Sequence, residues 1–186
     1  PSLPDIARLL GASSAQVQLT ISAYLIGFAA GQIIYGPVSD RHGRKPVLIG
    51  AIALYCAASL ACALSTSIEM LIVARAFQAL GGSGGIVLTR AIVRDIYSGA
   101  HAGRELSVIG SVMALAPVLA PVLGGLIQTA FGWRMTFLAL VGAGCAGGRG
   151  DLPHLPADHA LIRSNRVGKR AASAALSFGA VTILRV

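Results

Sequence analysis

Charged side chains are scarce in this chain of 186 residues: Asp, Glu, Lys and Arg together make up 12% of it. A soluble globular domain carries about 25%, so the composition excludes that class. Acidic residues are the rarest, 7 against 15 Lys and Arg, which leaves a formal net charge of +8. Hydrophobic residues reach 55% and the mean hydropathy is +0.74. This balance is typical of a polytopic membrane protein.

Cysteine and aromatic residues are also few. Cys56 and Cys62 fall in one apolar run and Cys145 in another, so no disulfide framework is indicated. The basic residues lie between apolar runs and in the last forty residues, without the aromatic neighbours that a nucleic-acid surface requires. The apolar runs contain no nucleophile–base pair, phosphate loop or metal-ligand spacing. We therefore expect no enzyme, cofactor, metal site or nucleic-acid partner.

Five apolar runs are expected to cross a membrane as helices, because about 20 apolar residues span a hydrocarbon core roughly 30 Å thick. The expected spans are 17–38, 47–64, 68–89, 106–130 and 132–148. They form one helical bundle, residues 1–148, surrounded by membrane lipid. The last span is weak, because its apolar part ends before Arg149.

The remaining tail, residues 149–186, follows no pattern that we expect after a membrane span. It holds 6 basic and 2 acidic residues, a net charge of +4. We expect a basic, atypical tail that is disordered or translated in a shifted reading frame. Because the chain opens on Pro1, we also expect it to begin inside a longer protein.

The most informative stretch lies between the first two runs and reads Gly-Pro-Val-Ser-Asp-Arg-His-Gly-Arg-Lys-Pro over residues 36–46. So short a connection makes the two helices antiparallel. Gly43 can adopt the positive φ of a tight turn, and Pro46 suits the first turn of the next helix. Three cations against one carboxylate leave +2, which predicts a cytoplasmic location.

The spacing G-x-x-x-D-R-x-G-R-K in this stretch resembles the loop between spans two and three of the major facilitator superfamily. The matching residues are Gly36, Asp40, Arg41, Gly43, Arg44 and Lys45. The resemblance implies a gating loop whose charges contact neighbouring helix ends in one of two alternating-access states. A generic basic turn would explain the cations, but not an acid and two glycines at fixed spacings.

Two charged residues further along the chain, Arg94 and Asp95, have two interpretations. They fall in the expected cytoplasmic connection 90–105. They either join the loop of Asp40 in one charge network or stay solvated, as surface charges usually do.

A single charged residue, Arg75, lies about two turns inside the run 68–89. Burying it costs roughly 2.5–3.5 kcal/mol on insertion scales, so it is expected to face the protein interior or a water-filled cavity. Snorkelling to the outer interface is the alternative. Arg75 and Gln78 resemble the superfamily's R-x-x-Q-G-x-G motif in span four, whose Arg is implicated in proton coupling. Ala79 and Leu80 depart from that motif, so only the first two residues carry over.

Two helical stripes follow the run 17–38. Small residues at four-residue spacing, Ala23, Gly27 and Gly31, allow a neighbouring helix to approach closely. The other stripe consists of larger residues, namely Tyr24, Phe28, Gln32 and Tyr35. One interpretation makes this second stripe the lining of a substrate cavity, with Tyr24 and Gln32 as site residues. The other makes the aromatics lipid-facing, with the Gln packed between helices.

Two prolines one turn apart, Pro117 and Pro121, are followed by Gly124 and Gly125 in the run 106–130. Such prolines remove backbone hydrogen bonds and bend a helix. The stretch resembles a span-five motif typical of antiporters in the superfamily, although Ala-Pro replaces its usual Gly-Pro. It is similar to the bicyclomycin/chloramphenicol-resistance (Bcr/CflA) branch of drug:proton antiporters. A kinked helix of any polytopic protein is the alternative.

These resemblances cover about residues 3–142 and imply an all-α membrane protein, part of the amino-terminal six-helix bundle of a major facilitator fold. They imply a multi-pass protein of the bacterial inner membrane that exports drugs in exchange for protons by alternating access. Its partners would be a small-molecule drug, protons, and a carboxy-terminal bundle missing from this sequence. The alternatives are a transporter of a metabolite such as a sugar or small acid, and a non-functional truncated half-transporter.

Overall fold

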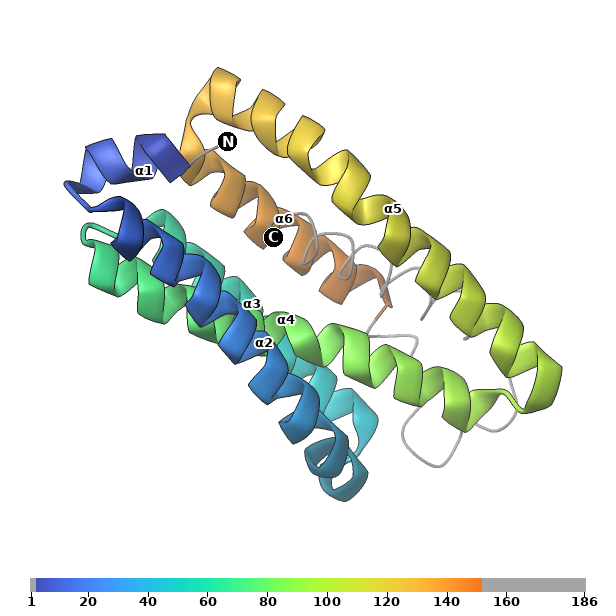
Figure 1. Cartoon of the computed structure of the whole chain (residues 1–186). Coiled ribbons are helices and arrows are strands. Elements are labelled where there is room, and N and C mark those ends of the chain that lie inside the picture. The colour runs from blue at the N-terminus through green and yellow to red at the C-terminus, as the bar shows by residue number, and fades with distance from the viewer. Residues whose placement is uncertain (1–2, 152–186) are drawn as a thin grey trace.

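The computed structural model describes residues 3–151, which form helices joined by very short connections (Figure 1). The helices are α1 (Leu3–Leu10), α2 (Ser14–His42), α3 (Arg44–Ala63), α4 (Ile68–Ile96), α5 (Gly99–Phe131) and α6 (Trp133–Asp151). Each of the five expected spans falls on one of the long helices α2 to α6. Residues 152–186, most of the tail considered above, lie outside the described residues.

Local sequence sets the helix boundaries. Ser13 and Gln16 form a capping box at the start of α2: the Ser13 Oγ accepts the Gln16 backbone N–H at 3.3 Å, and the Gln16 Oε1 accepts the Ser13 backbone N–H at 2.9 Å. Gly43 has a φ of +87° and Gly132 a φ of +82°, values that side chains rarely tolerate. Each of these glycines is the whole connection between two long helices, so the chain reverses direction at one residue.

The sequence predicts a loop over residues 36–46, and that prediction is wrong. The structure continues α2 to His42 and begins α3 at Arg44. The same holds for the expected connection 90–105, of which only Tyr97 and Ser98 lie outside a helix. Polar residues end a membrane span without ending its helix, because the backbone keeps its hydrogen bonds outside the hydrocarbon region.

α4 lies at the centre of the packing, with α2 and α3 against it; α6 packs on α3, and α5 lies beside α6 (Figure 1). The α2–α3 and α4–α5 turns lie at one end of the bundle, and the α3–α4 and α5–α6 turns at the other (Figure 1). At this second end the Arg134 Nη2 donates to the backbone carbonyl of Ser65 at 3.1 Å and joins the two turns. Neighbouring long helices are therefore antiparallel.

Three helices of residues 3–151 are long and apolar enough to cross a membrane: α2, α3 and α4. The described parts of α5 and α6 contribute shorter apolar stretches, Pro121–Phe131 and Trp133–Ala146. The second of these matches the weakness expected of the last span.

Glycines let α4 approach both of its neighbours. A Cβ atom on Gly27 of α2 would collide with the backbone carbonyl oxygen of Ala76, and one on Gly31 with the Ser83 Oγ. On the other side, a Cβ atom on Gly81 of α4 would lie 2.5 Å from the backbone nitrogen of Tyr55. The stripe of small residues seen in the sequence is thus a packing surface, as expected of small residues between membrane helices.

We expect Gly27→Ala to lower the free energy of unfolding by about 1–3 kcal/mol, the usual cost of overpacking. The obstacle is backbone, which cannot rotate away. The control is Gly50→Ala on α3, where nothing lies within 4 Å of the new Cβ; it should change stability by no more than the gain of about 0.5–1 kcal/mol from helix propensity. Thermal unfolding of the detergent-solubilised chain measures both. Equal effects of the two substitutions would contradict this packing.

Candidate functional site

One arginine joins three helix ends at the α2–α3 end of the bundle. The Arg44 Nε donates to the Asp95 Oδ2 at 3.0 Å, and its Nη1 lies 2.5 Å from the Asp40 Oδ1. The same Nη1 also donates to the Ser39 Oγ. Asp40 and Ser39 belong to the last turn of α2, Arg44 begins α3, and Asp95 lies in the last turn of α4. We call these four residues the charge cluster.

Exposure decides how much each ion pair contributes. The side chain of Arg44 is 19% exposed, that of Asp95 42% and that of Asp40 61%. Ion pairs this exposed are typically worth about 0–1 kcal/mol each. Asp95, the less exposed carboxylate, makes the stronger link, and it joins α3 to a helix distant in sequence. Together these contacts form a weak tie between helix ends, one that a moderate competing interaction can open.

The structure separates residues that the sequence grouped together. Of the pair Arg94 and Asp95, the acid joins the charge cluster while Arg94 is exposed. Arg41 is exposed as well. Gly36 has open space around it, and Gly43 supplies the turn. The matched motif therefore divides into two contacting charges, a turn residue and peripheral residues.

The second polar group lies inside the bundle, around Arg75. This residue is only 7% exposed. The Arg75 Nη1 donates to the Gln78 Oε1 at 2.9 Å, and the Gln78 Nε2 donates to the Ser59 Oγ at 2.8 Å. The Arg75 Cζ lies 4.5 Å from the centroid of the Tyr24 ring and 5.9 Å from that of Phe137. This group, the arginine cage, draws residues from α2, α3, α4 and α6.

The cage explains how a guanidinium is held among apolar helices. A desolvated cation over an aromatic ring gains about 2 kcal/mol, and a hydrogen bond to a charged group contributes about 1.5–3 kcal/mol. Together these are enough to offset the insertion cost of the charge, about 2.5–3.5 kcal/mol. Arg75 points into the bundle, so its side chain does not snorkel to the outer interface. Gln78 is 1% exposed and Ser59 fully buried, so the hydrogen-bonded chain is closed off from the surroundings of the bundle.

The larger stripe of α2 contradicts the interpretation with lipid-facing aromatics and a packed Gln32, whereas the cavity-lining role of Tyr24 and Gln32 stays a prediction. Tyr24 and Tyr35 are buried and Phe28 is half-buried, whereas Gln32 is exposed. Gln32 follows Gly31, which faces α4, and one residue turns the helix by about 100°, away from that contact. Tyr24 thus joins the arginine cage, while Gln32 lies outside it.

Two members of the cage, Ser59 and Phe137, were missed by the sequence analysis. Ser59 lies in the run 47–64, which is composed mainly of small and apolar residues. The hydroxyl of Ser59 in this apolar run was the signal that could have indicated a buried hydrogen bond. Phe137 carries no signal of its own, because an aromatic residue in a membrane span is ordinary.

The proline motif lies on α5, which continues as a helix through both prolines. Pro121 is exposed, and nothing in the described part of the chain lies within 4 Å of a Cβ placed on Gly124 or Gly125. The side chain of Pro117 falls outside the described ones. The antiporter role that this resemblance implies therefore remains a prediction.

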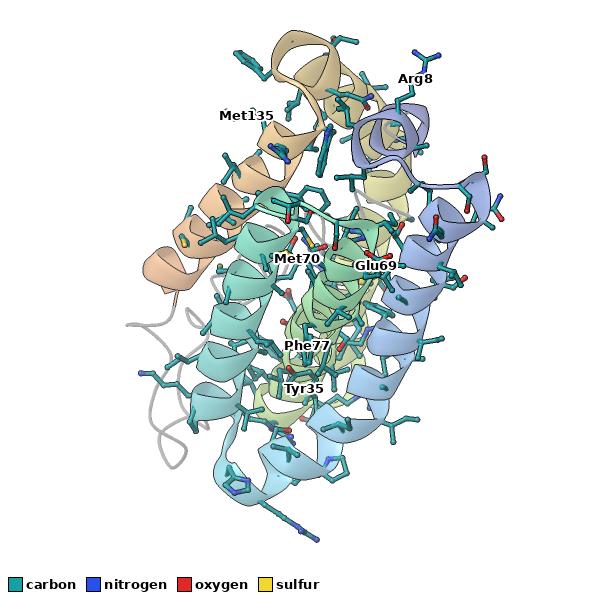
Figure 2. The ribbon with its side chains drawn as sticks, turned by 90° about the vertical axis from the view of Figure 1, so that its left-hand side faces the viewer. Arg8, Tyr35, Glu69, Met70, Phe77 and Met135 are labelled. Carbon is teal, nitrogen blue, oxygen red and sulfur yellow. The ribbon has the colours of Figure 1, made fainter. Side chains whose placement is uncertain are left out.

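A hollow of about 560 Å³ lies between α3 and α4. Figure 2 shows Glu69, Met70 and Phe77, three of its lining residues, on the side of α4 that opens between α2 and α3. Glu69 is its only charged lining residue, and Arg75 does not line it. Within residues 3–151, no three His, Cys, Asp or Glu side chains gather as metal ligands.

Asp95→Ala should lower the stability of the detergent-solubilised chain by about 1 kcal/mol or less, because it removes the less exposed partner of Arg44. The loss should shrink at about 1 M salt, where the Debye length falls to about 3 Å. Melting temperatures at low and high salt measure it. Asp40→Ala is the matched control, with a smaller expected loss because Asp40 is more exposed; a larger loss for Asp40→Ala would overturn this ranking.

Tyr24→Leu should destabilise the chain by about 1–2 kcal/mol more than Tyr24→Phe. Phe keeps an aromatic face over the Arg75 guanidinium, whereas Leu does not. Chemical denaturation of the two variants, measured side by side with the unchanged chain, gives the difference. Equal losses would show that the ring face does not stabilise the cation.

Comparison with known proteins points to one family. Residues 1–181 match the description of the Major Facilitator Superfamily. The chain is 41% identical over 145 residues to a chloramphenicol resistance protein of Pseudomonas aeruginosa, covering 77% of this chain and 34% of that protein. It is 35% identical over 147 residues to multidrug resistance protein D of Escherichia coli, covering 79% and 37%. No solved structure matches it at a significant level.

The match extends to a relative without an assigned substrate, an uncharacterised MFS-type transporter of Bacillus subtilis. That protein is 46% identical over 127 residues, covering 68% of this chain and 32% of the relative. The chain spans about a third of the length of these curated relatives. The helical architecture and the family match confirm the expected class, an all-α, multi-pass membrane protein. This chain belongs to the Major Facilitator Superfamily, a family of transporters.

Proposed function

We propose that the transporter containing this chain exports small drug molecules in exchange for protons, by alternating access, across the bacterial inner membrane. The observation that carries the proposal is the buried arginine cage, on the two residues that resemble a proton-coupling motif, in a chain similar to two drug-resistance proteins. The activity is that of the whole transporter, of which this chain supplies one part.

In this proposal the charge cluster biases one of the two access states. Two bundles rock about a site near the middle of the membrane, and we propose that the ends of α2, α3 and α4 shift slightly relative to one another as they do so. Arg44 holds these ends together through Asp40 and Asp95. Contacts worth about 1 kcal/mol shift a two-state balance severalfold without locking it, which suits a gate that must open in every cycle.

The arginine cage supplies a fixed positive charge. Arginine does not lose its proton in a protein, so Arg75 does not carry the coupled proton itself. Its charge stabilises the ionised form of a nearby carboxylate, and protonation of that carboxylate changes how strongly the two attract. In residues 3–151 the acids lie near helix ends rather than at the middle of a span. We place the protonatable carboxylate on another segment of the transporter.

The charge distribution supports a cytoplasmic location for the charge cluster. The α2–α3 and α4–α5 end carries 6 basic and 3 acidic residues, a net charge of 6 − 3 = +3: Arg41, Arg44, Lys45, Arg90, Arg94, Arg104, Asp40, Asp95 and Glu105. The α3–α4 and α5–α6 turns are flanked by Glu69 and Arg134, which cancel. By the positive-inside rule, the first end faces the cytoplasm.

The proposal is tested with a chimera in which this chain replaces the matching segment of the Pseudomonas chloramphenicol resistance protein. We expect cells expressing it to accumulate less chloramphenicol, and a protonophore to abolish the difference. Arg75→Gln should reduce gradient-driven efflux by about 5- to 150-fold, the range of a coupling energy of 1–3 kcal/mol. Arg134→Gln, at the opposite end from the charge cluster, is the control and should retain efflux once expression is matched.

The outcomes separate the alternatives. Efflux that survives the protonophore, or that Arg75→Gln and Arg134→Gln lower equally, would contradict proton coupling through the arginine cage. A chimera that reaches the membrane but moves no drug from a broad panel would contradict drug export. Uptake or release of a sugar or small acid by that same chimera would then establish the metabolite alternative.

A further inference from the structure

We propose that Cys56 and Cys145 form a thiol pair that hydrogen peroxide oxidises to a disulfide between α3 and α6. Their Sγ atoms lie 3.8 Å apart, although 89 positions separate them in the sequence. Both are free thiols in the structure. The inference is independent of the transported substrate, because it rests on the packing of two helices in one bundle.

The backbone around the pair is shaped for close approach. A Cβ atom on Gly144, next to Cys145, would lie 2.9 Å from the Cys56 Sγ and 3.4 Å from the ring of Tyr55. Glycine at this position leaves room for the Cys56 sulfur. A disulfide bond is about 2.05 Å long, so the two sulfurs, which lie 3.8 Å apart, must move about 1.75 Å closer to form one.

The two thiols differ from the third cysteine in their access to an oxidant. Cys145 is exposed and Cys56 half-buried, whereas Cys62 is fully buried in the core on α3. Cys62 lies near the Gln78 Oε1, at 4.0 Å, within the arginine cage. An oxidant small enough to enter the membrane therefore meets the first pair and not the third thiol.

The reaction balances with peroxide as the oxidant. The thiolate of one cysteine attacks a peroxide oxygen, the O–O bond breaks, and water leaves after a proton transfer, which yields a sulfenic acid. The second thiol attacks the sulfenic sulfur, the S–S bond forms, and a second water leaves. Two thiols and one peroxide give one disulfide and two waters.

The disulfide would brace the helix that closes the arginine cage. α6 contributes Phe137 to the cage and packs on α3, which contributes Ser59. Cys145 lies about two turns from Phe137 on the same helix. A covalent bond from α3 to α6 would therefore restrict the movement of Phe137 relative to Arg75.

The test counts thiols in the purified full chain in lipid nanodiscs, before and after treatment with hydrogen peroxide. The chain is denatured and the free thiols are labelled with a polyethylene-glycol maleimide. We expect three labels before oxidation and one after it, because the chain has three cysteines. Dithiothreitol should restore all three, and peptide mass spectrometry should find Cys56 linked to Cys145.

Single substitutions provide the controls. Cys62→Ser should still lose both remaining thiols, whereas Cys56→Ser and Cys145→Ser should keep two labels each. A Cys56→Ser chain that joins to a second copy through Cys145 faster than the unchanged chain forms its internal bond would overturn the proposal. So would a linkage involving Cys62, or loss of thiols one at a time to sulfinic acid. Since no outcome depends on transport, a failed efflux assay leaves this test unaffected.

Discussion

The close approach of α4 to both α2 and α3 is the constraint on which the rest of the structure depends. The glycines of α2 contact the backbone of α4, and Gly81 of α4 contacts the backbone of α3. In a membrane, helices gain little from hiding apolar surface, because lipid is equally apolar, and packing and interhelical hydrogen bonds must hold them together. Small residues make that packing dense. Both polar groups exist only because these backbones are so near.

The arginine cage is the clearest consequence. A guanidinium, an amide and a hydroxyl from α3 and α4 meet at hydrogen-bond distance, and a ring from α2 covers the cation. Were α4 farther from its neighbours, Arg75 would lose the Tyr24 ring and Gln78 would lose Ser59, so burial of the charge would become more costly. The same proximity brings the last turn of α4 to the start of α3, where Asp95 reaches Arg44. Packing at the centre of the bundle thus sets the geometry at its end.

α5 packs less closely than the other long helices among the described residues. Its apolar residues are largely exposed, among them Val118, Val122 and Leu126, and its paired glycines contact no described neighbour. An exposed apolar surface is ordinary in lipid, whereas a glycine pair with open space on a helix is not explained by lipid contact. The helices with many small residues facing one another, α2, α3 and α4, are the well-packed ones.

Much of this protein is determined by sequence alone. Apolar runs of spanning length require helices, since a membrane leaves backbone groups no other partners, and Gly43 between charged helix ends requires a sharp reversal. Arg75 and Gln78, three apart on a helix, share a face. These are local properties, set by composition, helical period and backbone sterics. They determine the class of the protein and place Arg75 and Gln78, two of the five residues of the arginine cage, on one face.

Only the tertiary structure decided which helices meet, and at which residues. Ser59, Phe137 and the Cys56–Cys145 pair acquire their roles from helices distant in sequence. Gln32 is exposed because one residue of helical rotation separates it from the face that packs on α4. The pattern along one helix reports which residues share a face, but not which neighbour that face contacts. That choice depends on the simultaneous packing of all helices.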